Sequence, residues 1–200
     1  MASSINIGEG LVASYILDAA QSRFEIRATA TGLLAAFGHN PVIAIRKFTG
    51  EVFYRPQAPE RSSLRMEIDP TSLAVGGDVD PRYRGEMERT LREELLETAR
   101  HPEIRFEGSA VQANRICEGM FRARIEGKLT LHGVVRDLEI PCTYTPGEDS
   151  IRANGEFTIR QTEYRIKLVS VAGGTLKLKD ELEIAFDILG SRRPEPAPGA

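Results

Sequence analysis

Apolar and polar residues alternate strictly along much of this chain. Successive side chains on a β-strand point to opposite faces, so a period of two indicates a strand with one buried and one solvated face. In one such run Phe24, Ile26 and Ala28 alternate with charged residues. The same pattern recurs over residues 64–68, 104–110, 121–129, 151–159, 176–178 and 182–188. Seven or more strands of this kind predict a mostly β barrel or sandwich.

Two further features favour a closed barrel with an antiparallel meander. The run 41–55 has Gly50 in its middle, which predicts one strand that a glycine bends where the sheet curves. Turn-forming residues at 145–149 leave only a short connection between neighbouring strands, as antiparallel hairpins require.

One segment follows a helical period instead. From Asp80 to Arg100 the apolar residues are spaced by four, which predicts an amphipathic helix. Asp80 is the expected N-cap, and Pro102 is expected to stop the helix. The i,i+4 pairs Glu88–Arg92 and Arg89–Glu93 are expected to support it. A single helix must pack on the barrel or cap one of its ends.

Composition narrows the class of protein. The 200 residues include 26 basic and 29 acidic ones, without basic blocks, which argues against a nucleic-acid partner. No run approaches the roughly 18 apolar residues of a membrane-spanning helix. Because the first residues lack the features of a signal peptide, we expect a cytoplasmic protein. We expect a flexible segment over 1–13, one barrel domain over 14–190 and a disordered, Pro-rich tail over 191–200.

Several local motifs together resemble the YceI-like family, whose members are lipocalin-like antiparallel barrels similar to polyisoprenoid-binding and related lipid-binding proteins. The motifs lie at residues 15–18 with Ser22 and Phe24, and at 48–52, 68–73, 101–106, 127–134 and 179–184. The resemblance covers about Ser14 to Leu189 and implies an extended eight-stranded barrel. The chain departs from the family pattern at Gln21, in the helix, and at Glu163–Arg165, where an acid, an aromatic residue and a glycine are usual.

Catalytic and metal sites are not indicated by the sequence. The histidines His39, His101 and His132 show no metal-ligand spacing, so we expect structural or capping roles and no bound metal. His132 follows a strand whose even-numbered residues are expected to face water. Cys117 and Cys142 form no CxxC motif, and no GxSxG motif is present. We therefore expect no enzymatic activity and no cofactor.

The functional prediction concerns the barrel interior. A barrel of eight strands is either filled by its own side chains or holds one small ligand. Small inward residues such as Ala123, Gly108 and Gly155 are expected to leave space among the phenylalanines. The expected ligand-binding residues are Phe24, Ile26, Phe37, Met66, Met87, Leu91, Phe106, Phe121, Ile125, Phe157, Ile184 and Phe186.

The sequence leaves two functions open. The first is binding, sequestration or transport of a long apolar molecule, such as an isoprenoid, a quinone or a fatty-acyl amide. The second is a protein-interaction or stress-protective module with a filled core. A continuous apolar space of several hundred Å³ favours the first. In either case we expect a monomer or a homodimer.

Overall fold

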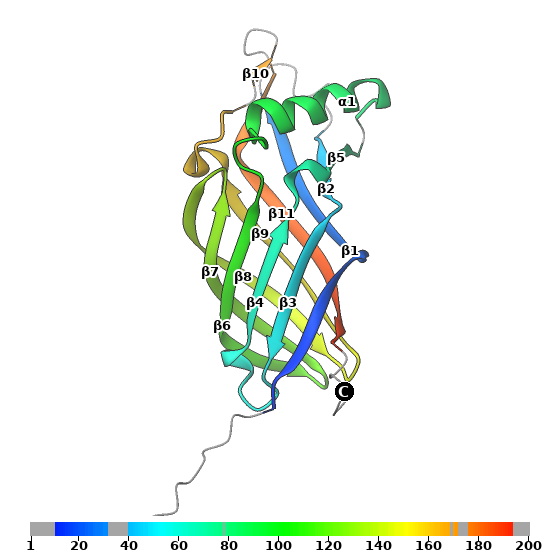
Figure 1. Ribbon diagram of the computed structural model, residues 1–200, viewed down its shortest axis with the longest axis vertical. Helices are drawn as coiled ribbons and strands as arrows, with labels where there is room; N and C mark the ends of the chain where they lie inside the picture. Colours follow the sequence, from blue (N-terminus) through cyan, green and yellow to red (C-terminus); the bar gives the residue numbers. More distant parts are fainter. Residues whose placement is uncertain (1–10, 32–39, 78, 169, 172–175, 194–200) are drawn as a thin grey trace, which may run out of the picture.

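The computed structural model describes residues 11–31, 40–77, 79–168, 170–171 and 176–193. Within these residues, eleven strands form one continuous sheet that closes on itself (Figure 1). They are β1 (Ala13–Thr31), β2 (Val42–Ile45), β3 (Phe48–Tyr54), β4 (Ser63–Ile68), β5 (Leu73–Gly76), β6 (Ile104–Cys117), β7 (Met120–Leu131), β8 (Val134–Pro146), β9 (Ser150–Arg160), β10 (Ser170–Val171) and β11 (Leu176–Arg192).

The sheet is a closed, eight-stranded, antiparallel barrel, as the sequence predicts. Neighbours follow chain order, and β1 pairs with β11 to close the barrel. Two positions in the wall are each filled by two short strands. β3 and β2 lie one after the other along β1, at Ala13–Ile16 and Glu25–Arg27, and β4 and β5 lie beside them. The short β10 adds only a two-residue pairing to β11.

The interruption of the second wall position was predicted at the wrong residue. The strand breaks at Arg46 and Lys47, and Gly50 lies inside β3 opposite Met66. A short turn, η2 (Pro70–Ser72), explains the break, because it binds the Lys47 backbone. The Lys47 amide donates to Ser72 Oγ at 3.0 Å, and the Lys47 carbonyl accepts from the Asp69 amide at 3.1 Å. The turn therefore separates β2 from β3 and β4 from β5 at the same height along the barrel.

A bulge in β1 belongs to one of the motifs quoted above. Asp18 Oδ1 accepts hydrogen bonds from the amides of Ala20 and Gln21, at 2.9 and 3.2 Å. Ser22 Oγ donates to the Asp18 carbonyl and accepts from the Leu189 amide at 3.0 Å. The register with β11 shifts between Asp18 and Arg23. These side chains replace ladder hydrogen bonds where the long strand bends.

The helix begins where the sequence predicts and ends earlier. α1 (Pro81–Thr90) has Asp80 as its N-cap and continues through a π-helical turn, η3 (Leu91–Leu95). The Glu88–Arg92 and Arg89–Glu93 ion pairs form at 3.9 and 3.8 Å. The segment stops at Leu95 rather than Arg100, because Glu97 is left-handed at φ 43°. It crosses one end of the barrel (Figure 1).

One strand and one boundary differ from the sequence predictions. The sequence analysis did not identify β8, because Pro141 interrupts its alternating run. The strand tolerates this proline because Pro141 lies outside the part of β8 that pairs with β9. β11 continues through Arg192, inside the segment expected to be disordered. Arg193 Nη1 then pairs at 2.9 Å with Glu51, a buried carboxylate that also accepts from Arg65 at 3.0 Å. Residues 1–10 and 194–200 lie outside the described residues.

None of the helices in the described residues is long and apolar enough to cross a membrane.

Candidate functional site

The inward faces of the strands build an almost entirely apolar interior. Every alternating run identified in the sequence from residue 104 to 159, and those around Phe24, Met66 and Ile184, presents its apolar residues to this core. The larger cluster of buried residues reaches the helix at Leu91, Leu95 and Leu96. A smaller cluster around Tyr54 and Tyr144 lies at the opposite end of the barrel, near η1 (Pro59–Arg61).

The interior is not completely filled. Three cavities of about 90, 120 and 130 Å³ follow one another from the Tyr144 end to the helix end. The first and second share Ile125 and Ala153 among their lining residues, and the second and third share Phe24 and Phe157. Together they reach the lower end of the range of about 300–1,000 Å³ typical of small-molecule sites. Among the residues that the structure describes, no carboxylate and no imidazole lines these cavities.

Most of the residues expected to bind a ligand border these cavities. They are Phe24, Ile26, Met66, Leu91, Phe106, Ile125, Phe157, Ile184 and Phe186. Phe121 instead stacks on Tyr144, with ring centroids 5.2 Å apart, and borders none of the three cavities. Met87 is half-buried on α1 and borders none of the three, because only the end of the helical segment reaches the interior. Phe37 lies outside the described residues.

The expected role of the small residues is correct for alanine and wrong for glycine. Ala123 and Ala153 border the first cavity, and Ala28 borders the third. Phenylalanine rings cover the glycines. A Cβ atom on Gly108 would lie 2.8 Å from Cζ of Phe106, and one on Gly155 would lie 2.8 Å from Cζ of Phe186. The space therefore lies beside the alanines.

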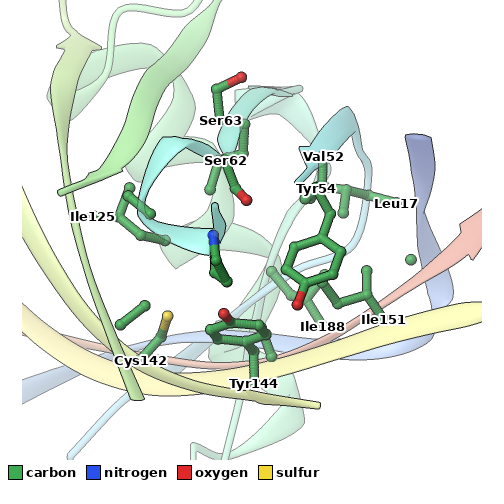
Figure 2. A pocket seen from close by; sticks show the side chains of 16 residues that line it. Leu17, Val52, Tyr54, Ser62, Ser63, Ile125, Cys142, Tyr144, Ile151 and Ile188 are labelled. Atoms are coloured by element: carbon green, nitrogen blue, oxygen red, sulfur yellow. The ribbon is translucent and has the colours of Figure 1, made fainter. Parts of the chain in front are cut away.

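The first cavity contains a polar patch that the sequence did not indicate. Tyr54 and Tyr144 pack edge to face, with centroids 5.9 Å apart, and both hydroxyls face the cavity (Figure 2). The Tyr144 hydroxyl is buried and makes no well-formed hydrogen bond among the described residues; the Tyr54 hydroxyl is near enough to affect its pKa, but less than burial does. Burial raises the pKa of both tyrosines. It also raises the pKa of Cys142 to about 11, so this thiol stays protonated and unreactive at neutral pH.

Other lining residues were missed because they belong to elements that showed no clear alternation. Leu17 precedes the β1 bulge, and Val52 follows the break between β2 and β3. Cys142 and Tyr144 lie on β8, the strand that Pro141 concealed. Ser62 and Ser63 lie just before the alternating run of β4, and Ser63 is the first residue of that strand. Alternation within Leu138, Ile140, Cys142 and Tyr144 is the signal that identifies β8 once Pro141 is disregarded.

His101 and His132 lie side by side, which their spacing in the sequence did not predict. Glu97, His101 and His132 place ligand-type atoms within 4.8 Å of one another. The side chain of His132 is only 9% exposed, contrary to its expected position on the solvated face. The reason is the left-handed backbone of His132 and Gly133, φ 50° and 72°, which turns the ring inward. His101 follows the helix instead of ending it, and His39 lies outside the described residues.

The fold and its interior define a closed antiparallel barrel with a row of apolar cavities and a helix across one end. The chain belongs to the family of YceI-like domains, whose model matches residues 15–189. The expected resemblance is thereby confirmed.

Similar proteins fall into two groups. Proteins called UPF0312 from Pseudomonas savastanoi pv. phaseolicola and Pseudomonas syringae pv. syringae are 25% identical over 189 residues, which are 92% of this chain and 90% of theirs. Among solved structures, BcnA of Burkholderia cenocepacia has a TM-score of 0.63 and 18% identity, covering 86% of this chain and 98% of its own. A polyisoprenoid-binding domain from Saccharophagus degradans has a TM-score of 0.63 and 15% identity, with coverage of 90% and 98%.

Proposed function

We propose that this protein is a non-catalytic carrier that holds one long apolar molecule inside its barrel. The observation that carries the proposal is the row of three cavities, lined by strand residues from the Tyr144 end to the helix end. Removing a hydrocarbon chain from water contributes about 0.8 kcal/mol per methylene, so even a partly enclosed chain gains substantial affinity. The description of the Saccharophagus degradans domain as polyisoprenoid-binding agrees with this class of ligand.

The Tyr144 hydroxyl narrows the chemical class of the ligand. A buried hydroxyl without a partner costs about 1–3 kcal/mol, and a ligand that offers an acceptor or donor at this point removes that cost. We therefore propose an amphipathic ligand with one polar group beside Tyr144 and an apolar chain directed toward the helix. A quinone with an isoprenoid tail and a fatty-acyl amide both fit this description; a plain hydrocarbon leaves Tyr144 unsatisfied.

Tyr144→Phe tests this orientation. The variant is expected to weaken binding of a quinone with an isoprenoid tail about five- to tenfold, because one net hydrogen bond of about 1 kcal/mol is lost. Binding of the matching isoprenoid hydrocarbon should be unchanged or tighter. Fluorescence titration of delipidated protein with both probes measures the difference.

The same variant has a second signature without ligand. Because Tyr144→Phe removes an unpaired buried hydroxyl, ligand-free protein is expected to be as stable as the wild type or more stable in urea unfolding. Equal loss of affinity for both probes would contradict the proposed polar contact. Failure of the wild type to bind either probe would contradict the carrier function and favour the interaction module.

A further inference from the structure

Three side chains with metal-ligating atoms converge at the end of the barrel that the helix covers. Glu97 follows η3, His101 precedes β6, and His132 lies in the turn between β7 and β8. The imidazole rings of His101 and His132 are 4.4 Å apart between centroids. The ligand atoms of all three residues lie within 4.8 Å of one another. These residues border none of the three interior cavities, so they form a separate site.

The hydrogen bonds of His132 determine which nitrogen carries the proton. Nδ1 lies 3.1 Å from the carbonyl oxygen of Tyr164, and a carbonyl can only accept, so Nδ1 carries the hydrogen. In the neutral imidazole, Nε2 then carries a lone pair and can only accept a hydrogen bond. It lies 3.1 Å from Oε2 of Glu97, which as a carboxylate oxygen is also only an acceptor. Two acceptors at this distance require a positive charge between them, either a proton or a metal ion.

Glu97 is available as an anionic ligand. Arg100 Nη1 donates to its other oxygen, Oε1, at 2.9 Å and leaves Oε2 facing His132. A glutamate carboxylate is ordinarily ionised at neutral pH, so Oε2 can bind a metal ion without first losing a proton.

The turn residue Gly133 makes room for the third ligand. A Cβ atom on Gly133 would lie 2.8 Å from Cε1 and 2.9 Å from Nδ1 of His101. Only a residue without a side chain lets this ring lie against the turn that carries His132. The backbone carbonyl that orients His132 comes from Tyr164, which is 2% exposed, so this outer partner is fixed in the core. A histidine whose second nitrogen donates to a backbone carbonyl is the usual arrangement of a metal ligand.

We propose that Glu97, His101 and His132 form a binding site for a divalent transition-metal ion of the zinc type. Two imidazoles and one carboxylate are the donor set that zinc accepts in tetrahedral sites, with the fourth position left to water. The ion replaces the proton between His132 and Glu97 and joins the segment after the helix to the β7–β8 turn. The proposal replaces the expectation, drawn from the sequence, that the histidines have only structural or capping roles.

Metal titration tests the site directly. Tag-free protein carrying Cys117→Ser, which removes an exposed thiol, is treated with a chelator and titrated with Zn²⁺ in a calorimeter. We expect one ion per chain with micromolar or tighter affinity and a rise in melting temperature of several degrees. Co²⁺ should give visible absorption bands of nitrogen and oxygen ligation without a thiolate charge-transfer band.

Conservative variants locate the ligands. His101→Gln, His132→Gln and Glu97→Gln are each expected to weaken Zn²⁺ binding at least about tenfold and to remove the Co²⁺ bands. Glu103→Gln is the matched control, because Glu103 pairs with Arg105 nearby and is expected to have no effect. The site is ruled out if the protein binds no stoichiometric Zn²⁺, or if the binding survives both histidine changes. If the wild type binds no Zn²⁺ but the His132→Gln variant is less stable than the wild type, the cluster is only an ion pair and the proposal is overturned.

Discussion

Gly127→Ala is expected to destabilise the barrel by about 3 kcal/mol, a large fraction of the stability of a domain of this size. Gly127 faces Gly108 across the β6–β7 ladder. A Cβ atom there would collide with the backbone carbonyl of Glu107, and would lie 2.7 Å from the Gly108 Cα atom and 2.7 Å from the Phe106 ring. Two of these contacts are backbone, so rotating a side chain cannot relieve them. Urea unfolding measures the change.

Gly85→Ala is the matched control. Gly85 lies on the exposed side of α1, and apart from its chain neighbours and the backbone of its own helix, no atom of the described residues lies within 4 Å of the position of an added Cβ. Alanine is the better helix former by about 0.8–1.0 kcal/mol, so this variant should be more stable than the wild type. The same glycine-to-alanine substitution is thus expected to lower stability at Gly127 and to raise it at Gly85. A Gly127→Ala protein as stable as the wild type would contradict the close approach of β6 and β7.

Ile125→Glu is expected to lower affinity for the carried ligand on the order of a hundredfold or more. Ile125 borders both the first and the second cavity, so a carboxylate there meets the ligand chain midway along the barrel. An unpaired charge in an apolar space is costly, and the ligand would remove the water that otherwise solvates it. The measurement is titration with an acyl-chain or isoprenoid probe, after circular dichroism has verified the fold.

Two further variants separate loss of the ligand from loss of the fold. Ile125→Leu keeps the size and apolar character of the site and should retain binding. Ala153→Phe introduces no charge and occupies the space shared by the first two cavities, so it should also reduce binding. Full probe affinity in folded Ile125→Glu and Ala153→Phe proteins would show that the ligand lies elsewhere.

The barrel itself could be predicted because alternation depends on neighbouring residues alone. Phe24, Met66, Phe106 and Ile184 were assigned to the interior from local sequence, and each is buried there. Prediction failed where a distant contact decides the structure. Lys47 breaks its strand because Ser72 and Asp69 bind its backbone, and no residue near Lys47 indicates this.

The two sites differ in how far sequence could define them. Alternation identified most of the cavity wall, but the distribution of space within it depends on ring orientation, as with Phe106 over Gly108. The meeting of Glu97, His101 and His132 depends on three left-handed or turn residues and on the position of the helix end. The spacing of the histidines along the chain indicates neither these backbone conformations nor the position of the helix end.

The central claim, that the barrel holds a long apolar molecule, is tested most directly by native mass spectrometry of wild-type protein purified without detergent. We expect a discrete mass increment that organic extraction removes and that belongs to a lipid with one polar group. Folded wild-type protein that shows no increment, and takes up neither isoprenoid nor acyl-chain probes, would contradict the claim.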